Sequence, residues 1–153
     1  MWRLEVIARN ALKLSETDAL KVVTDNKSVQ FDAIRLNRSV QLYEKGIGVD
    51  GRELRSAYAR YGNVYANRTI AYKREKNQPI NRVTLRDTGA FYQTFGTKLK
   101  AGELYLTANT IKDGEDLQDR FSQVVGLTKE SKEQLLYQAK PIVLQYVASK
   151  ILR

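Results

Sequence analysis

Few residues of this chain could carry out acid–base or nucleophilic chemistry. Its 153 residues include no cysteine and no histidine, which removes thiol nucleophiles, His-based proton transfer and zinc sites of the Cys/His kind. Asp87 with Arg82 or Arg86, beside Gly89, is the polar cluster that remains. A helix cap with surface cations fits the same residues, and we favour it. We therefore expect a protein that is not an enzyme and needs no cofactor.

An acidic run offers the nearest approach to a metal site. Lys112-Asp-Gly-Glu-Asp-Leu-Gln-Asp119 places several carboxylates together, and Ca²⁺ and Mg²⁺ prefer oxygen ligands. The spacing does not match an EF-hand loop, and acidic residues are also favoured at the start of a helix. We interpret the run as a helix start and expect no metal.

The net charge is +9, from 26 Lys and Arg against 17 Asp and Glu. Such a balance favours contact with polyanions, above all nucleic acid. The densest basic region lies between residues 68 and 86, and tyrosines interleave with it. A nucleic-acid surface, a subunit interface and a solvated face over a tyrosine-lined core edge all fit this pattern, and we favour the last. The candidates for contact with DNA or a partner subunit are Lys73, Arg74, Lys76, Arg82 and Arg86.

Three helices are expected in the first 45 residues. The apolar spacing predicts an amphipathic helix over 2–13, and Ser15 is placed to cap a second helix that ends near Val23. Asp25 or Asn26 can cap a third helix over 27–44. An apolar stripe is expected along that third helix, and Gly46 is expected to end it; the stripe consists of Val29, Ala33, Leu36, Val40 and Tyr43.

The middle of the chain is expected to hold the motif that carries the function. The sequence predicts a helix over 64–76, which Pro79 separates from a strand over Ile80–Leu85. Asp87 is then expected to cap a short helix, while Thr88 and Gly89 form the turn. Phe91 and Phe95 are expected to anchor this helix to the sheet. We accordingly expect Gly89→Val to unfold or disassemble the protein.

The remaining elements are a hairpin and a long final helix. Residues 94–99 and 103–107 flank an Ala-Gly turn and predict a β-hairpin. A turn is expected over 110–114 and a short helix over 116–122. Thr128 is placed to cap the final helix, which contains Pro141 and reaches about residue 152. The fold class is therefore α+β, with N-terminal helices, a small antiparallel sheet with a hairpin, and a long C-terminal helix.

A single domain over 1–153 is expected. Within it we distinguish a helical N-terminal arm over 1–45, a sheet-containing core over 46–127 and the C-terminal helix over 128–153. The hydrophobic fraction of 42% and charged fraction of 28% are typical of a globular chain. No apolar run approaches the roughly 20 residues that a membrane span needs, so we expect no membrane association.

Three pieces of this chain, which are the stretch over 82–95, the hairpin that follows it and the stretch from Phe121 to Ser131, resemble the tail-completion, or virion morphogenesis, proteins of tailed bacteriophages. The main one is Arg82-Val-Thr-Leu-Arg-Asp-Thr-Gly-Ala-Phe-Tyr-Gln-Thr-Phe95, which is followed by the hairpin. Val124-Val-Gly-Leu-Thr128 is similar to the approach to the C-terminal helix in those proteins. The segment from Asn37 to Ile47 resembles a helix end of small phage structural proteins. Asp119-Arg-Phe-Ser122 stands where many members carry a histidine segment.

The resemblance implies a structural role in the neck of a virion. Such proteins join the head connector to the tail and assemble as homo-oligomeric rings, with DNA passing through the channel. The implied partners are portal or connector proteins and tail proteins, and the implied location is the virion, with assembly in the host cytoplasm. A ring around DNA needs cations that meet phosphates without reading sequence. The alternative is a nucleic-acid-binding protein without sequence specificity.

Overall fold

The computed structural model describes residues 15–56, 64–121 and 123–152. Its elements are α2 (Glu16–Asp25), α3 (Lys27–Arg35), the π-helix η1 (Leu36–Lys45), α4 (Asn67–Glu75), α5 (Ala90–Gln93), β1 (Gly96–Lys100), β2 (Glu103–Thr107), β3 (Ile111–Lys112), β4 (Glu115–Asp116), α6 (Leu117–Phe121) and α7 (Lys129–Ile151). The α+β class is confirmed. The helix expected over 2–13 lies outside the described residues.

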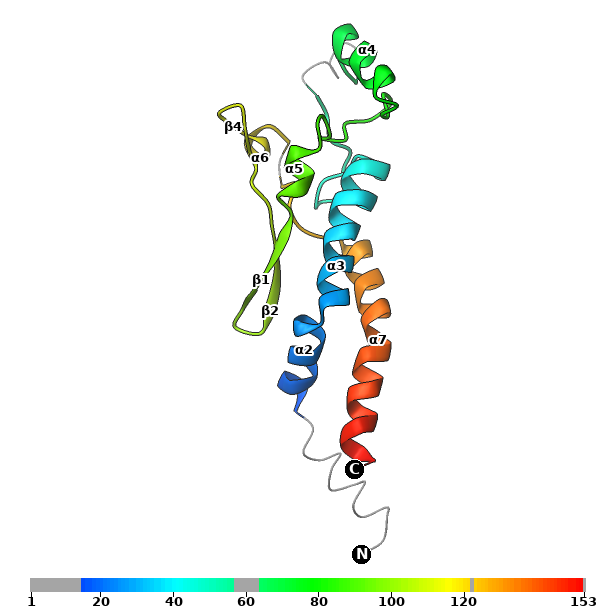
Figure 1. The fold of residues 1–153 in the computed structure, drawn as a ribbon, viewed down its shortest axis with the longest axis vertical. Helices are drawn as coiled ribbons and strands as arrows, with labels where there is room; N and C mark the ends of the chain where they lie inside the picture. The colour runs from blue at the N-terminus through cyan, green and yellow to red at the C-terminus, as the bar shows by residue number, and fades with distance from the viewer. Residues whose placement is uncertain (1–14, 57–63, 122, 153) are drawn as a thin grey trace, which may run out of the picture.

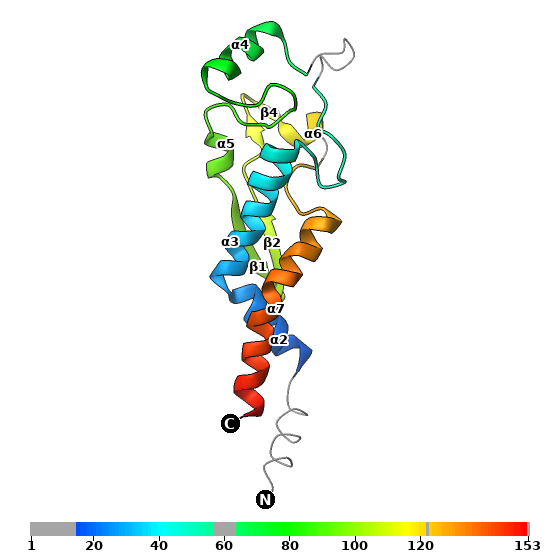
Figure 2. The same ribbon diagram turned by 90° about the vertical axis from the view of Figure 1, so that its right-hand side faces the viewer.

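The molecule is elongated around a column of helices. In Figure 1, α2, α3 and η1 continue one another along the long axis, with α7 on one side of the column and the β1–β2 hairpin on the other. Figure 2, turned by 90°, shows α7 in front of the column and the hairpin behind it. Helix α4 lies at the end of the column far from the chain's C-terminus. The column therefore separates α7 from the hairpin.

Side-chain caps set the starts of α2 and α3. The Ser15 hydroxyl accepts a hydrogen bond from the Asp18 amide at 3.1 Å, and the Asn26 side chain accepts from the amides of Ser28 at 2.9 Å and Val29 at 3.4 Å. Both cap residues have extended backbone, as an N-cap requires. Asn26 thus ends α2 and begins α3. The sequence left the cap open between Asp25 and Asn26 and placed the end of the second helix near Val23, two residues too early.

The third helix changes its winding halfway. It is α-helical over Lys27–Arg35 and then forms the π-helix η1, which ends at Gly46 with φ +66°. The expected stripe is therefore wrong in its second half, because Val40 and Tyr43 are only half-buried. In a π-helix residues five apart share a face. The buried side chains of η1 follow that rule and are Leu36, Asn37, Gln41 and Leu42.

Two small antiparallel sheets form instead of one. Strands β1 and β2 pair from Gly96↔Thr107 to Lys100↔Glu103, and their two-residue turn has φ +51° at Ala101 and +79° at Gly102, as a type I′ turn requires. Strands β3 and β4 form a second hairpin around Asp113. The turn expected over 110–114 is thus part of a hairpin that the sequence analysis did not predict.

Helix α7 begins at the predicted cap and packs along the column. The Thr128 hydroxyl accepts from the Ser131 amide at 3.1 Å, and Pro141 lies inside the helix. One face of the helix points inward: Ala139 is buried, and Leu135 and Ile142 are half-buried. Contacts link α7 to α2, α3 and η1.

A cluster of buried apolar side chains lies where η1 meets the stretch over 82–95. Leu42, Leu54, Val83 and Val124 form it, and none of them belongs to either sheet. These residues come from four segments that are distant in sequence. The core is therefore built by η1 and loops rather than by the sheets.

Candidate functional site

The expected strand over Ile80–Leu85 does not form. No described strand pairs with it, and Leu85 has φ +53°, in the left-handed region. Val83 and Thr84 are nonetheless buried. Buried backbone groups need hydrogen-bond partners, and here side chains supply them. We call residues 82–87 the clamped loop.

Two tyrosines hold the centre of the clamped loop. The Tyr65 hydroxyl donates to the Arg82 carbonyl at 2.8 Å and accepts from the Thr84 amide at 3.1 Å. The Tyr92 hydroxyl donates to the Thr84 carbonyl. Burial raises the pKa of both hydroxyls, so both are neutral donors at ordinary pH. Tyr92 was not among the expected site residues, although it lies within the motif.

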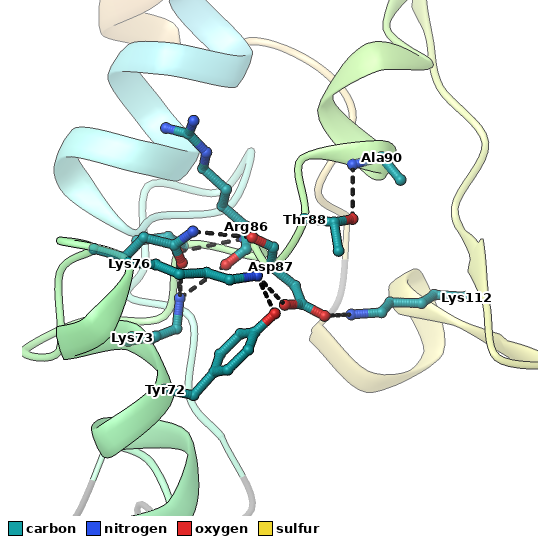
Figure 3. Close-up of polar contacts among 10 residues, drawn as sticks. Tyr72, Lys73, Lys76, Arg86, Asp87, Thr88, Ala90 and Lys112 are labelled. Carbon is teal, nitrogen blue, oxygen red and sulfur yellow. Dashed lines mark hydrogen bonds and ion pairs between the residues drawn. The ribbon is translucent and has the colours of Figure 1, made fainter.

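Lys73 holds the end of the same loop from α4. Its ammonium donates to the Gln78 side chain at 3.0 Å, to the Thr84 hydroxyl at 3.3 Å and to the Arg86 carbonyl at 2.8 Å, as Figure 3 shows in part. The residue is only 5% exposed, and desolvation lowers its pKa. The expectation that Lys73 contacts DNA is therefore wrong, because its charge points into the protein.

Asp87 is not a helix cap. The N-cap residue of α5 is Gly89, which has no side-chain cap, while the Thr88 hydroxyl accepts from the Ala90 amide at 3.3 Å. Asp87 lies one turn outside that helix, so its carboxylate is free to meet cations from other segments. The expected left-handed turn at Gly89 is confirmed by φ +94°.

The Asp87 carboxylate instead interacts with side chains from α4 and its C-cap and from the β3–β4 hairpin. Lys112 lies 3.4 Å from one oxygen and Lys76 3.9 Å from the other, and Figure 3 shows both cations and Tyr72 around it. The Tyr72 hydroxyl lowers the pKa of Asp87 most, partial burial opposes that effect, and Lys112 and Lys76 lower it further. Asp87 thereby links α4 to the β3–β4 hairpin.

The other basic candidates differ in how far they are engaged. Arg82 donates to the Tyr43 carbonyl at 2.9 Å, and the Arg86 guanidinium lies 5.1 Å from the centre of the Tyr43 ring. Lys76 lies over the Tyr72 ring. Arg74 is exposed and makes no side-chain hydrogen bond or ion pair with the residues that the structure describes. The five predicted cations therefore do not form one free basic surface.

The aromatic residues of the motif form a cluster of their own. Phe91 and Phe95 meet edge to face at 5.2 Å, and Tyr92 completes the group at 6.0 and 6.3 Å from them. Such pairs add to the burial of the rings. The expectation that Phe91 and Phe95 anchor to the sheet is wrong, because both pack against the cluster of Leu42 and Val83.

Two buried amide side chains of η1 hold the segment over 124–128, which leads into α7. Asn37 donates to the Val124 carbonyl at 3.1 Å and accepts from the Gly126 amide at 3.2 Å. Gln41 donates to the Gly126 carbonyl at 3.0 Å and accepts from the Thr128 amide at 3.0 Å. Both side chains are fully buried. The sequence analysis missed them, although two amides four residues apart inside an apolar stripe could have indicated a buried polar pair.

A cleft of about 480 Å³ lies beside Asp87. Its lining mixes signs: Arg68, Lys73, Arg86, Lys112 and Arg120 face Asp87, Asp113, Glu115 and Asp116. Such a lining does not select one ligand charge. Within the described ranges, no three acidic side chains gather as a metal site would require, and no helix has the length and apolarity to cross a membrane.

Comparisons with known proteins were made at three levels. No family model, no curated protein and no solved structure matches this chain.

Proposed function

We propose that this chain is a structural protein of a phage virion neck, which oligomerises around the DNA channel between head connector and tail. The observation that carries the proposal is the mutual packing of three segments, two that resemble tail-completion proteins and one that resembles small phage structural proteins. They are the motif over 82–95, the approach over 124–128 and the helix end over 37–47. In the folded chain these segments share one core.

The contacts among the three segments are specific. Leu42, Val83 and Val124 belong to the same buried cluster, one from each segment. Asn37 and Gln41 add four hydrogen bonds to the backbone of the approach segment. Residues that resemble phage structural proteins at three separate places, and that pack as one unit, support a common origin of the three likenesses.

The chemistry of the motif also favours a structural role. Three side chains donate hydrogen bonds to backbone carbonyls of the clamped loop, and they are Tyr65, Tyr92 and Lys73. A catalytic group instead presents its polar atom to a substrate at the required geometry. The clamped loop therefore behaves as a scaffold that fixes the shape of this end of the molecule.

The positive charge supports a position next to DNA. Arg74, Lys76 and Arg86 are exposed among the predicted candidates, and exposed cations neutralise phosphates without reading bases. Binding to nucleic acid as an independent function is the second candidate, favoured by the net charge of +9. It requires affinity for DNA in the absence of any virion partner.

The test combines the purified chain with head-connector and tail proteins encoded by the same genome. Native mass spectrometry and negative-stain imaging are expected to reveal a ring or a stable complex on the connector. In parallel, binding of the chain alone to duplex DNA is titrated over a range of salt concentrations. Phosphate contacts make the affinity fall steeply with salt.

The outcomes separate the two candidates. A complex with connector or tail proteins supports the neck proposal. If the chain binds no virion protein but binds DNA at physiological salt, the result supports nucleic-acid binding as the independent function. A chain that does neither contradicts both.

A further inference from the structure

The outward face of α7 carries an apolar stripe. Tyr137 is 78% exposed, Leu144 57% and Leu152 65%, although such residues are usually buried. With Pro141 and Ala148 between them, they follow the three- and four-residue spacing that places side chains on one helix face. We define the α7 stripe as the exposed residues Tyr137, Pro141, Leu144, Ala148 and Leu152.

A second apolar surface lies beside α2. Leu20 and Leu99 line a groove of about 680 Å³ between α2 and the β1–β2 turn, and they remain 49% and 44% exposed. The same lining holds two acidic and two basic residues, which are Glu16, Asp25, Lys21 and Lys100. We call this surface the α2–hairpin groove. Both leucines are about half exposed to solvent. They leave an apolar area that another element could cover.

The two surfaces are placed for different neighbours. Helix α7 and the β1–β2 hairpin flank opposite sides of the helical column (Figures 1 and 2). A head-to-tail contact between identical subunits joins two different patches of the chain, and a ring closes when the rotation permits. A two-fold contact would use one patch twice and leave the other uncovered.

Charge favours the head-to-tail arrangement. Between Gln134 and Leu152 the only charged residues are Lys140 and Lys150, so this part of α7 has a net charge of +2. The lining of the α2–hairpin groove carries Glu16 and Asp25 together with Lys21 and Lys100, so it has no net charge in a chain whose total is +9. Pairing α7 with another α7 would bring cations together, whereas the groove offers two carboxylates and adds no net positive charge.

We infer that the α7 stripe of one copy docks into the α2–hairpin groove of the next copy. The contact repeats from subunit to subunit, with Tyr137 and Leu144 covering Leu20 and Leu99. Lys140 lies at the edge of the stripe, toward the acidic residues of α2. This inference rests on the proposed ring function and names the surfaces that build the ring.

Cysteine cross-linking tests the contact directly, because the chain has no cysteine of its own. Leu144→Cys and Leu99→Cys are made in separate preparations, mixed and mildly oxidised, both alone and with the connector and tail proteins. The expected result is a cross-linked product that contains one copy of each variant. Gln118→Cys on α6, exposed and outside both surfaces, is the control and is expected to stay uncoupled.

Two cross-linking results would overturn the inference. Leu144→Cys coupling mainly to itself would show a two-fold contact through α7. Absence of the mixed product under both conditions would show that these surfaces do not meet.

Charge insertion provides a second, quantitative measurement. Leu144→Glu and Leu20→Glu each place a carboxylate in the proposed contact, and each is expected to raise the dissociation constant of self-association about tenfold or more. Phe31→Glu is the matched control, since Phe31 is 62% exposed on α3 and belongs to neither surface. Thermal melting checks that all three variants fold. Equal effects of the three would contradict the inference.

The failure of this inference differs from the failure of the proposed function. A complex on the connector without the mixed cross-link leaves the neck proposal standing and removes the docking contact. Self-association with the mixed cross-link, but without any virion partner, keeps the docking contact and removes the neck proposal.

Discussion

The hydroxyl of Tyr65 lies 3.1 Å from the backbone nitrogen of Thr84 and accepts its hydrogen. In a β-sheet that hydrogen would bond to a neighbouring strand. Thr84 is fully buried, so its amide cannot turn to water instead. Tyr65, in the segment before α4, therefore supplies the clamped loop with the hydrogen-bond partners that a neighbouring strand supplies in a β-sheet.

The exchange of Tyr65 for phenylalanine tests this relationship. Tyr65→Phe keeps the ring but leaves the Thr84 amide and the Arg82 carbonyl without their partner. We expect the free energy of unfolding to fall by about 1–3 kcal/mol, measured by urea denaturation. The matched control, Tyr137→Phe, changes a 78% exposed hydroxyl and is expected to stay within about 0.5 kcal/mol. Equal effects would show that the clamp adds no stability.

Neighbouring cations on α4 are expected to respond differently to removal of charge. Lys73→Met leaves three acceptors without a donor, although relief from desolvation offsets part of the loss. We expect a decrease of about 2–4 kcal/mol in the free energy of unfolding. Arg74→Met alters an exposed neighbour and is expected to leave stability nearly unchanged. A stable Lys73→Met protein would mean that the Thr84 and Arg86 acceptors are satisfied in another way.

Asp87 is expected to contribute to acid sensitivity. Its pKa is lowered in the folded protein, so its contribution is present above the ordinary value of 3.8 and is lost as pH falls below that value through the folded pKa. Asp87→Asn removes the contribution. The melting temperature of this variant should therefore fall less than that of the parent between about pH 5 and about pH 2.5. Asp119→Asn, at an exposed position on α6, is the control, and identical curves for Asp87→Asn and the parent would contradict the prediction.

Two of the glycines with positive φ, Gly46 and Gly89, should differ in what they tolerate. Gly89 has φ +94° but nothing within 4 Å of an added methyl group, whereas a methyl group at Gly46 would lie 3.0 Å from the Val83 carbonyl oxygen. We expect Gly89→Ala to cost about 1–2 kcal/mol and Gly46→Ala about 2–4 kcal/mol, measured by chemical denaturation.

The same geometry revises the expectation that Gly89→Val unfolds or disassembles the protein. This variant should be strained by its backbone angle but should still fold, because the side chain meets open space. An unfolded Gly89→Val protein would show that the turn matters more than its surroundings indicate. A smaller loss for Gly46→Ala than for Gly89→Ala would contradict the comparison.

Helix starts and the main hairpin could be predicted because their causes are local. Ser15, Asn26 and Thr128 each cap a helix through an amide within three residues, so the chain needs no distant contact to specify them. The Ala101-Gly102 turn joins two alternating runs and fixes their register in the same way. These elements contain the information for their own conformation within a few residues.

Other features depended on contacts that no short window of sequence contains. Whether residues 80–85 become a strand is decided by a partner strand, and here Tyr65 and Lys73 occupy the hydrogen-bonding sites instead. Phe91 and Phe95 were rightly expected to pack, but their partners come from η1 and the clamped loop. Alternation alone does not distinguish a paired strand from a buried loop.

The sequence by itself determined the α+β class, the order of the helices, the caps at Ser15 and Thr128, and the absence of cysteine and histidine. Tertiary structure decided that Lys73 points inward, that Asp87 bridges α4 to the second hairpin and that the third helix unwinds to a π-helix around Asn37. The physical reason is the range of the forces involved. Caps and turns act over three or four residues, whereas burial of an ammonium or an amide is stable only when distant segments supply its partners.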